Sequence, residues 1–139
     1  VIKKYGDFSD YVSLHVRRGD YIKLSEFHNV LCTEYYKKAM SQFEKNVKFL
    51  VFSDDLAWCK ANMPFAKRVK FISCDDDYEE MLLMSVCKSN IIANSTFSWW
   101  AAWFNGNDKK VVIYPEKWFG PKNSHLSIED LCPKEWRRM

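Results

Sequence analysis

Two adjacent arginines follow a short apolar segment near the start of the chain. The sequence His15-Val16-Arg17-Arg18-Gly19-Asp20-Tyr21 comes directly after Tyr11-Val12-Ser13-Leu14, which has the pattern of a short buried strand. In open α/β sheets ligands bind outside the carboxyl ends of the strands, so we expect both guanidinium groups at that edge. Because a guanidinium group pairs well with phosphate oxygens, the segment predicts an anion site. The alternative is that both arginines are solvated loop charges.

Polar side chains also follow two later strand-like segments. They are Ser53, Asp54 and Asp55 after the second segment, and Asn94, Ser95, Thr96 and Ser98 after the fourth. All of them are expected at the same edge of the sheet as the arginines. Small hydroxyl groups and backbone N–H groups at a helix start make a favourable phosphate cradle. The later group also fits simple helix capping, and the two uses are compatible.

The acidic run Asp75-Asp76-Asp77 permits two interpretations. Two carboxylates that flank one residue can hold a divalent cation against a diphosphate. The same acids precede an amphipathic helix pattern, whose N-terminus they would stabilise without any metal, and we favour this interpretation. Glu80, in the first turn of that helix, has the acceptors to bind the ring N–H and amino group of guanine, although most such glutamates are only solvated.

Strand and helix patterns alternate along the chain and supply a scaffold for these residues. We expect strands at 11–16, 47–52, 69–73, 90–93 and 111–114. Helices are expected at 32–44 with Thr33 as its cap, from Asp54 or Asp55 to 62 before Pro64, at 78–88, and at 96–104 with Ser95 or Thr96 as its cap. A loop with one turn at 128–131 should follow. This order predicts a single α/β domain over residues 1–139, with a Rossmann-like, mostly parallel sheet flanked by helices.

Composition narrows the classes of partner. The net charge of +3 is small, and the basic residues are spread along the chain, so nucleic acid is not indicated. No apolar stretch approaches the roughly 18 residues of a membrane-spanning helix. The five cysteines form no CxxC pair, which indicates reduced thiols, a cytoplasmic protein and no zinc site. The Gly-x-Gly-x-x-Gly and P-loop signatures are absent, which argues against the usual NAD and ATP sites. Arg18-Gly19-Asp20 matches the adhesion tripeptide, but three residues are too few to be specific.

Three segments together resemble the inverting α-1,2-fucosyltransferases, which form glycosyltransferase family 11. They are His15 to Tyr21, Phe52-Ser53-Asp54-Asp55 with Trp58-Cys59, and the run from Glu80 to Trp103 that contains Asn94-Ser95-Thr96-Phe97-Ser98-Trp99-Trp100. The resemblance implies a GDP-fucose donor, a galactose-terminated glycan acceptor whose 2-hydroxyl is fucosylated with inversion, and no metal or other cofactor. It also implies the two-domain GT-B architecture, of which this chain resembles the C-terminal, donor-binding half. The partner would then be the N-terminal domain of the same enzyme.

The resemblance also implies roles for individual residues. Arg17 would contact the β-phosphate of the donor and stabilise the departing GDP, and Arg18 would support the loop. His15 and Glu80 would bind guanine, while Ser53 and Asp54 would lie beside the nucleotide. The diphosphate pocket would be lined by Thr96, Phe97 and Ser98, next to the cradle residues Asn94 and Ser95. Asp20 and Glu26 are candidate general bases, His15 is a weaker one, and the N-terminal half is another source.

The sequence also leaves two alternatives to a complete fucosyltransferase. A different nucleotide-sugar donor, or a metal held by Asp75 and Asp77, is an alternative within the transferases. A nucleotide-binding domain without turnover in isolation is an alternative outside them. A position at the inner face of a bacterial membrane is expected, with peripheral association as an option. The helical spacing of Trp99, Trp100 and Trp103 predicts that they pack, either inside this domain or against the N-terminal domain.

Overall fold

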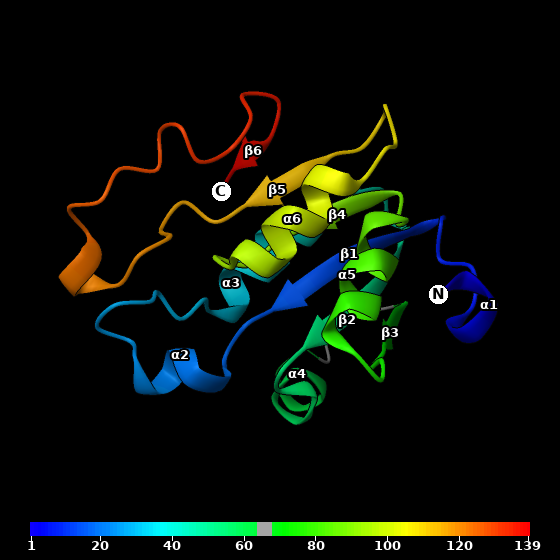
Figure 1. Cartoon of the computed structure of the whole chain (residues 1–139), viewed down its shortest axis with the longest axis horizontal. Coiled ribbons are helices and arrows are strands. Elements are labelled where there is room, and N and C mark those ends of the chain that lie inside the picture. The colour runs from blue at the N-terminus through cyan, green and yellow to red at the C-terminus, as the bar shows by residue number, and fades with distance from the viewer. Residues whose placement is uncertain (64–67) are drawn as a thin grey trace.

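A six-stranded parallel sheet forms the centre of the computed structural model, which describes residues 1–63 and 68–139 (Figure 1). The strand order is β3-β2-β1-β4-β5-β6, and every neighbouring pair is parallel. The strands are β1 (Tyr11–Val16), β2 (Lys48–Ser53), β3 (Val69–Phe71), β4 (Ser89–Ile91), β5 (Val112–Tyr114) and β6 (Arg137–Arg138). The α/β, Rossmann-like fold predicted from the sequence is therefore confirmed.

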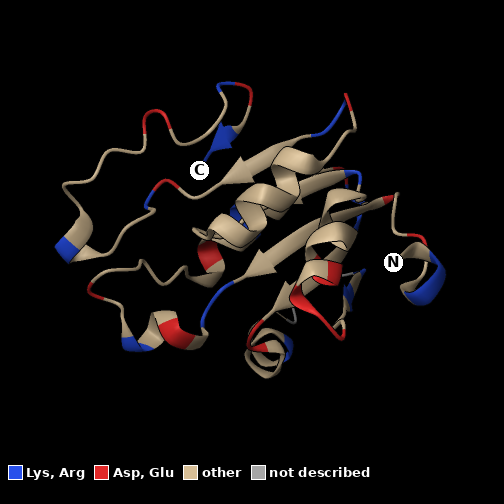
Figure 2. Ribbon diagram, in the orientation of Figure 1, with Lys and Arg blue, Asp and Glu red and all other residues tan. Residues whose placement is uncertain are grey.

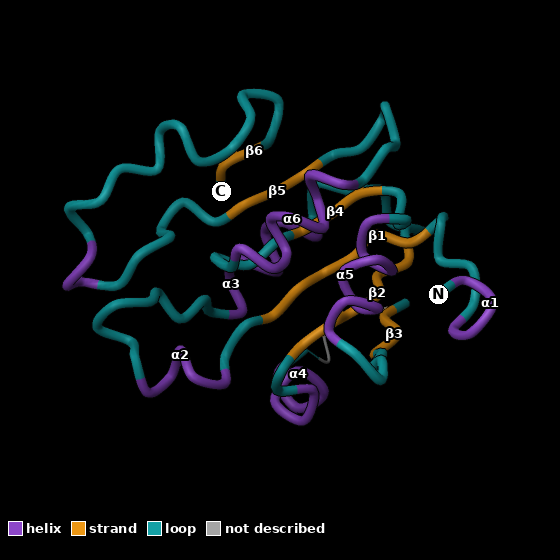
Figure 3. The backbone as a smooth tube through the Cα atoms, in the orientation of Figure 1, coloured by secondary structure: helices purple, strands orange, loops and turns teal. Residues whose placement is uncertain are grey.

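Helices cover both faces of the sheet. Figure 3 shows the loops that join the helices and strands. The helices are α1 (Ile2–Tyr5), α2 (Gly19–Lys23), α3 (Thr33–Met40), α4 (Leu56–Asn62), α5 (Asp77–Ser85), α6 (Thr96–Phe104) and the 3-10 turn η1 (Pro121–Asn123). The helices α5 and α6 pack together on one face of the sheet, whereas α3 and α4 pack on the other. None of the helices described is long and apolar enough to span a bilayer.

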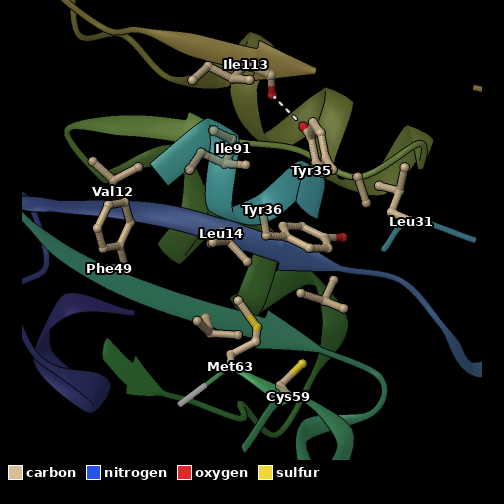
Figure 4. Close-up of a cluster of buried hydrophobic side chains, with 14 residues drawn as sticks. Val12, Leu14, Leu31, Tyr35, Tyr36, Phe49, Cys59, Met63, Ile91 and Ile113 are labelled. Atoms are coloured by element: carbon tan, nitrogen blue, oxygen red, sulfur yellow. Dashed lines mark hydrogen bonds between the residues drawn. The ribbon is translucent and has the colours of Figure 1, made fainter. Parts of the chain in front are cut away.

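The core is divided between the two faces because alternate residues of each strand point to opposite sides. Val12, Leu14 and Val16 pack with α3 and α4, whereas Leu50 and Phe52 pack with α5 and α6. Two buried tyrosines of α3 also tie the first face to the strands (Figure 4). The Tyr35 hydroxyl donates to the Ile92 and Ile113 carbonyls at 2.6 and 3.3 Å, and the Tyr36 hydroxyl donates to the His15 carbonyl at 3.2 Å.

Several predicted helix boundaries need correction. The helix predicted at 32–44 ends at Met40, since residues 41–46 form turns in which the Ser41 hydroxyl donates to the Lys38 carbonyl. Its N-cap is Cys32 and not Thr33, and no side chain caps it. Asp55 caps α4 by accepting from the Trp58 N–H at 3.1 Å, which decides between Asp54 and Asp55. Pro64, expected to stop this helix, lies outside the described residues.

Short elements were missed for a physical reason. The helices α1 and α2 have four and five residues, and β6 has two, so none is long enough to show a hydrophobic period. The strand β6 is held instead by pairing, because Ile113 aligns with Arg137. The predicted turn at 128–131 is present, with the Leu131 N–H donating to the Ile128 carbonyl at 3.1 Å.

Candidate functional site

A cavity of about 280 Å³ opens at the carboxyl ends of β1, β2 and β3. Its walls come from segments far apart in the sequence, and they carry both signs of charge (Figure 2). The lining residues are His15, Arg17, Ser53, Asp54, Ser73, Cys74, Asp77, Glu80 and Phe97. The predicted edge is therefore hollowed, and six of the twelve residues predicted for the site line this cavity.

Two carboxylates and an aromatic ring position the Arg17 side chain. Its Nη2 lies 2.9 Å from Asp20 Oδ1, and its Nε lies 3.5 Å from Asp54 Oδ2. The guanidinium group also lies over the Tyr21 ring, 5.4 Å from the ring centre. No residue in the described part of the chain bonds Nη1. The fork is thus oriented by the protein and keeps a donor for a ligand.

Arg18 is part of the support of this loop. Its guanidinium group lies 3.8 Å from the centre of the Trp58 ring, and its Nε is 3.7 Å from Asp55 Oδ2. Its backbone N–H donates to Asp54 Oδ1 at 2.9 Å. A Cβ atom at Gly19 would overlap Asp54 Oδ2, so a larger residue there would displace the Asp54 side chain. Arg18 does not line the cavity, and its supporting role stays a prediction.

His15 lines the cavity and has a neutral, buried nitrogen without a partner among the residues that the structure describes. The side chain is on the α5–α6 face of β1, and its ring centre is 5.5 Å from that of Phe97. The residue is 4% exposed, and its Nδ1 has no hydrogen-bond partner in the described chain. Burial, with the nearby charge of Arg17, lowers the pKa of His15 to about 3. Because a buried polar atom is costly when unpaired, this nitrogen is suited to a ligand.

The opposite wall is acidic and comes from the start of α5. Glu80 Oε1 accepts from the Cys74 N–H at 3.3 Å, and burial raises the pKa of Glu80, with smaller contributions from Asp77 and Asp54. Burial likewise raises the pKa of the Cys74 thiol to about 11, so this thiol is not activated as a nucleophile. Ser53 is used within its own turn, where its hydroxyl oxygen accepts from the Asp55 N–H at 2.9 Å.

The segment before α6 contributes less to the cavity than the sequence suggested. Phe97 lines the cavity, Thr96 is exposed, and Ser95 and Ser98 are buried without lining it. Asn94 joins three segments: its Nδ2 donates to the Asn29 and Trp118 carbonyls at 2.7 and 2.8 Å, and its carbonyl accepts from the Tyr21 hydroxyl at 2.9 Å. A role of these four residues as ligands stays a prediction.

The acidic run at the start of α5 forms an ion pair with α1. Asp75 pairs with Lys4 at 2.8 Å, and Asp76 occupies the N-cap position without a capping side-chain bond. These acids therefore lie at the predicted place, before and in the first turn of α5, but Asp76 makes no capping hydrogen bond. The described residues contain no group of three or more histidines, cysteines or acids arranged to hold a metal ion.

Three lining residues were not predicted to line the cavity. They are Ser73, Cys74 and Asp77, of which Asp77 was considered only as a metal ligand or a helix cap. Ser73 and Cys74 follow β3, so the same strand-end rule that selected residues after β1 and β2 would have found them. Within this chain, only one of the three tryptophans of α6 packs as predicted, and packing of the other two against a further domain stays a prediction. The Trp99 Nε1–H donates to the Leu131 carbonyl at 2.9 Å, but Trp100 and Trp103 are 45% and 53% exposed. The small residues Ser98, Ala101 and Ala102 form the buried side of α6 instead.

Fold and cavity together place the chain among Rossmann-like α/β proteins whose ligand cleft lies at the carboxyl edge of a parallel sheet. The chain belongs to glycosyl transferase family 11, whose family model matches residues 4–139. The family suggested by the sequence motifs is therefore confirmed.

Relatives of this family differ in the activity that their names state. The chain is 47% identical over 127 residues to the O-antigen biosynthesis glycosyltransferase WbnK of Escherichia coli, covering 84% of this chain and 42% of that protein. It is 42% identical over 138 residues to an alpha-1,2-colitosyltransferase of Escherichia coli, covering 92% of this chain and 47% of that protein. It is 32% identical over 131 residues to galactoside alpha-(1,2)-fucosyltransferase 1 of Bos taurus, covering 86% and 35%. The chain spans less than half the length of these relatives, and no solved structure matches it.

Proposed function

We propose that the chain is the donor-binding part of an inverting α-1,2-glycosyltransferase that transfers L-fucose from GDP-β-L-fucose to the 2-hydroxyl of a galactose-terminated glycan. The observation that carries the proposal is that one cavity is lined by Arg17, whose guanidinium group is oriented, and by His15, whose buried Nδ1 has no partner among the described residues. The first suits a diphosphate and the second suits a base edge. Membership of glycosyl transferase family 11 supports transfer as the reaction.

Arg17 has the central role in the proposed mechanism. The acceptor oxygen attacks the anomeric carbon from the face opposite GDP, the bond from that carbon to the β-phosphate oxygen breaks, and the configuration changes from β to α. Negative charge develops on the departing GDP. A guanidinium group already held by Asp20 and Asp54 stabilises this charge without reorganising during the reaction.

Guanine would be held by the inner wall of the cavity. The Glu80 carboxylate has two oxygens, of which Oε1 already accepts from the Cys74 N–H, so Oε2 is the better placed acceptor for guanine. His15 Nδ1 offers one further polar contact, and the Phe97 ring adds an apolar wall. UDP and ADP do not present adjacent ring N–H and amino donors together, so this wall should favour GDP.

Asp20 is the general base that this chain offers. It is exposed, and its Oδ1 lies 2.9 Å from Arg17 Nη2. As the base it would have to reach the acceptor hydroxyl on the face of the sugar opposite GDP. The other candidate, Glu26, is paired with Lys122 at 2.8 Å. A base from the N-terminal domain is the alternative. This domain is the partner that we propose for the GT-B architecture.

We further propose that the reaction needs no metal, because Arg17 would offset part of the diphosphate charge and Asp75 is paired with Lys4. The expected place of the reaction is the cytoplasmic side of a bacterial membrane, where peripheral association would bring the enzyme to its acceptor.

A second donor is favoured by one observation, the 42% identity to an alpha-1,2-colitosyltransferase. Colitose is L-fucose without its 3-hydroxyl, so GDP-colitose presents the same nucleotide and anomeric carbon. Only residues that contact the 3-position would distinguish the two donors. The guanine and diphosphate contacts proposed above hold for either.

The test is an incubation of the folded chain with GDP-fucose or GDP-colitose, lactose and EDTA, followed by NMR of the product. The proposal predicts that the chain binds at least one of the two donors, and that any product formed carries an α-(1→2) linkage to galactose. Binding of a donor without transfer is the result expected of a donor-binding domain that needs its partner for turnover. A folded chain that neither binds nor consumes either donor would contradict the proposal.

A further inference from the structure

A second hollow, of about 400 Å³, lies at the other edge of the sheet. Its walls come from the end of α6, the connection from α6 to β5, and the segment before β6. The side chains that matter here are Trp103, Asp108, Lys110, Glu135 and Trp136. Lys110 precedes β5 whereas Arg17 follows β1, so in a parallel sheet the two cavities lie at opposite edges (Figure 1).

The Trp103 indole forms a rigid, accessible wall of this hollow. It is 53% exposed, and its ring is stacked on that of Trp99 with a centre distance of 5.4 Å and an interplanar angle of 8°. Trp99 is in turn packed against Trp136 at 5.6 Å and bonded to the Leu131 carbonyl. The platform is thus fixed before any ligand binds, which lowers the entropy cost of binding.

Polar groups that can make further hydrogen bonds surround the Trp103 ring. Asp108 and Glu135 are exposed and have no hydrogen bond or ion pair with another described residue. Lys110 Nζ donates to the Ala102 and Asn105 carbonyls at 2.8 and 2.6 Å, so one of its three N–H donors remains. The hollow therefore offers two carboxylate acceptors and one cationic donor beside an aromatic face.

A pyranose fits this combination better than other classes of ligand. It has an apolar C–H face that can lie on an indole, and hydroxyl groups at its rim that can donate to carboxylates. The two carboxylates oppose an anionic ligand such as a nucleotide. The volume of about 400 Å³ lies within the roughly 300–1,000 Å³ that is typical of small-molecule sites.

We propose that this hollow is a glycan-binding subsite, separate from the donor cleft, which holds one or two neutral pyranose units of a glycan chain. Trp103 is the platform, and Asp108 and Glu135 accept from sugar hydroxyls. The subsite goes beyond the proposed transfer reaction, because its contacts are independent of GDP. It would retain a long acceptor or product at a distance from the reacting galactose.

The test uses the whole chain labelled with 5-fluorotryptophan and fluorine NMR. Lactose, N-acetyllactosamine and lacto-N-neotetraose are titrated with and without saturating GDP, and tryptophan resonances are assigned by single Trp→Phe variants. We expect a saturable shift of the Trp103 resonance that is the same with and without GDP. Replacement Trp103→Ala should weaken binding, reported by the Trp99 resonance, by about tenfold or more.

Trp100→Ala is the matched control. Trp100 is on the same helix, is 45% exposed and contacts Trp99 edge to face at 4.9 Å, but does not line the hollow. This variant should bind like the parent. No saturable shift of Trp103 with any of the three glycans, an equal loss in Trp100→Ala, or a shift that follows protein concentration and not glycan would each overturn the inference. GDP binding in the same sample reports separately on the donor cleft.

Discussion

At the scale of single residues, Arg17 has the most testable role, namely to bind the diphosphate. Lysine keeps the charge but loses the planar fork that Asp20 and Asp54 orient. We expect Arg17→Lys to lower GDP affinity by roughly thirtyfold, about 2 kcal/mol, as measured by calorimetry. In a form that turns over, transfer should fall several hundredfold, about 3–4 kcal/mol of barrier.

Arg137→Lys is a suitable control for Arg17→Lys, since Arg137 is exposed and far from the cavity in β6. GDP affinity should not change in this variant. Near-parental affinity and turnover in Arg17→Lys would show that the fork does not contact the diphosphate.

Gly19 tests whether the loop must approach Asp54 closely. An added Cβ would overlap Asp54 Oδ2, and Asp54 can rotate away, so Gly19→Ala should cost only about 1 kcal/mol of unfolding free energy. The rotation removes the bond to the Arg18 N–H and one partner of Arg17. We therefore expect GDP affinity to fall roughly fivefold to tenfold.

Gly106→Ala provides the matched comparison, because a Cβ there meets nothing within 4 Å. Calorimetry should find GDP affinity unchanged in this variant. Equal affinities in the two alanine variants would argue that the Asp54 contacts do not shape the donor site.

His15 predicts a pH dependence of stability. Its pKa is about 3 in the folded state and near the ordinary 6.5 when unfolded, so between these values only the unfolded chain binds the proton. Its contribution to the free energy of unfolding is therefore lost as pH falls through this window. From pH 7 to pH 5 the loss should be about 2 kcal/mol.

Urea unfolding at pH 7 and pH 5 measures this loss, with His15→Gln as the reference that cannot titrate. The parent should lose about 2 kcal/mol more than the variant over this interval. An equal change in both proteins would mean that the buried imidazole takes up a proton readily, contrary to the environment described here.

The residue scale also shows what a sequence can and cannot predict about the site. Strand-end position was enough to select His15, Arg17 and Asp54, because parallel strands bring their carboxyl ends together. It could not separate the loop support given by Arg18 from the ligand contact expected of Arg17. That difference depends on where Trp58 packs, which is a tertiary contact without a local signal.

At the scale of elements, two long loops form a flap beyond the carboxyl ends of the strands. We define this flap as residues 24–29 and 118–123, which extend past β1 and β5 (Figure 1). The Gly120 N–H donates to the Phe27 carbonyl at 2.8 Å and the Lys122 N–H to the Glu26 carbonyl at 2.7 Å. Asn94 anchors the base of both loops. The flap thus extends past the same edge of the sheet as the cavity (Figure 1).

Gly120→Ala should separate the two loops of the flap. A Cβ there would lie 2.5 Å from the Ser25 carbonyl oxygen and 2.7 Å from the Glu26 carbonyl carbon, which are backbone atoms that cannot rotate away. We expect a loss of about 1–3 kcal/mol of stability. Hydrogen exchange should show loss of protection at the amides of residues 120 and 122, while the β1 amides stay protected. Unchanged protection in the flap would contradict this account, and Gly106→Ala is again the control.

Elements could be predicted where they are long and periodic. The six residues of β1 and the nine of α6 matched the predicted bounds, since β1 is an almost wholly buried strand and α6 begins directly after the predicted cap Ser95. The helix α2 and strand β6 could not be found, because their positions depend on contacts with distant segments. Neither could the pairing of the flap, whose backbone bonds join residues 93 and more positions apart in the chain.

At the scale of the whole molecule, the central claim is that one edge of the sheet binds a guanine nucleotide without a metal. The arrangement of Arg17, His15 and Glu80 in a single cavity supports this claim. Metal dependence would point instead to Asp77 and its neighbours, and GDP binding would then need Mg²⁺ and be lost in Asp77→Asn.

Calorimetric titration of the folded chain with GDP in EDTA, with UDP and ADP as comparison ligands, tests the claim most directly. The account predicts a single GDP site whose affinity is the same after Mg²⁺ is added, and much weaker binding of UDP and ADP. Equal binding of all three nucleotides, a requirement for Mg²⁺, or no GDP binding by a chain shown to be folded by circular dichroism would contradict it.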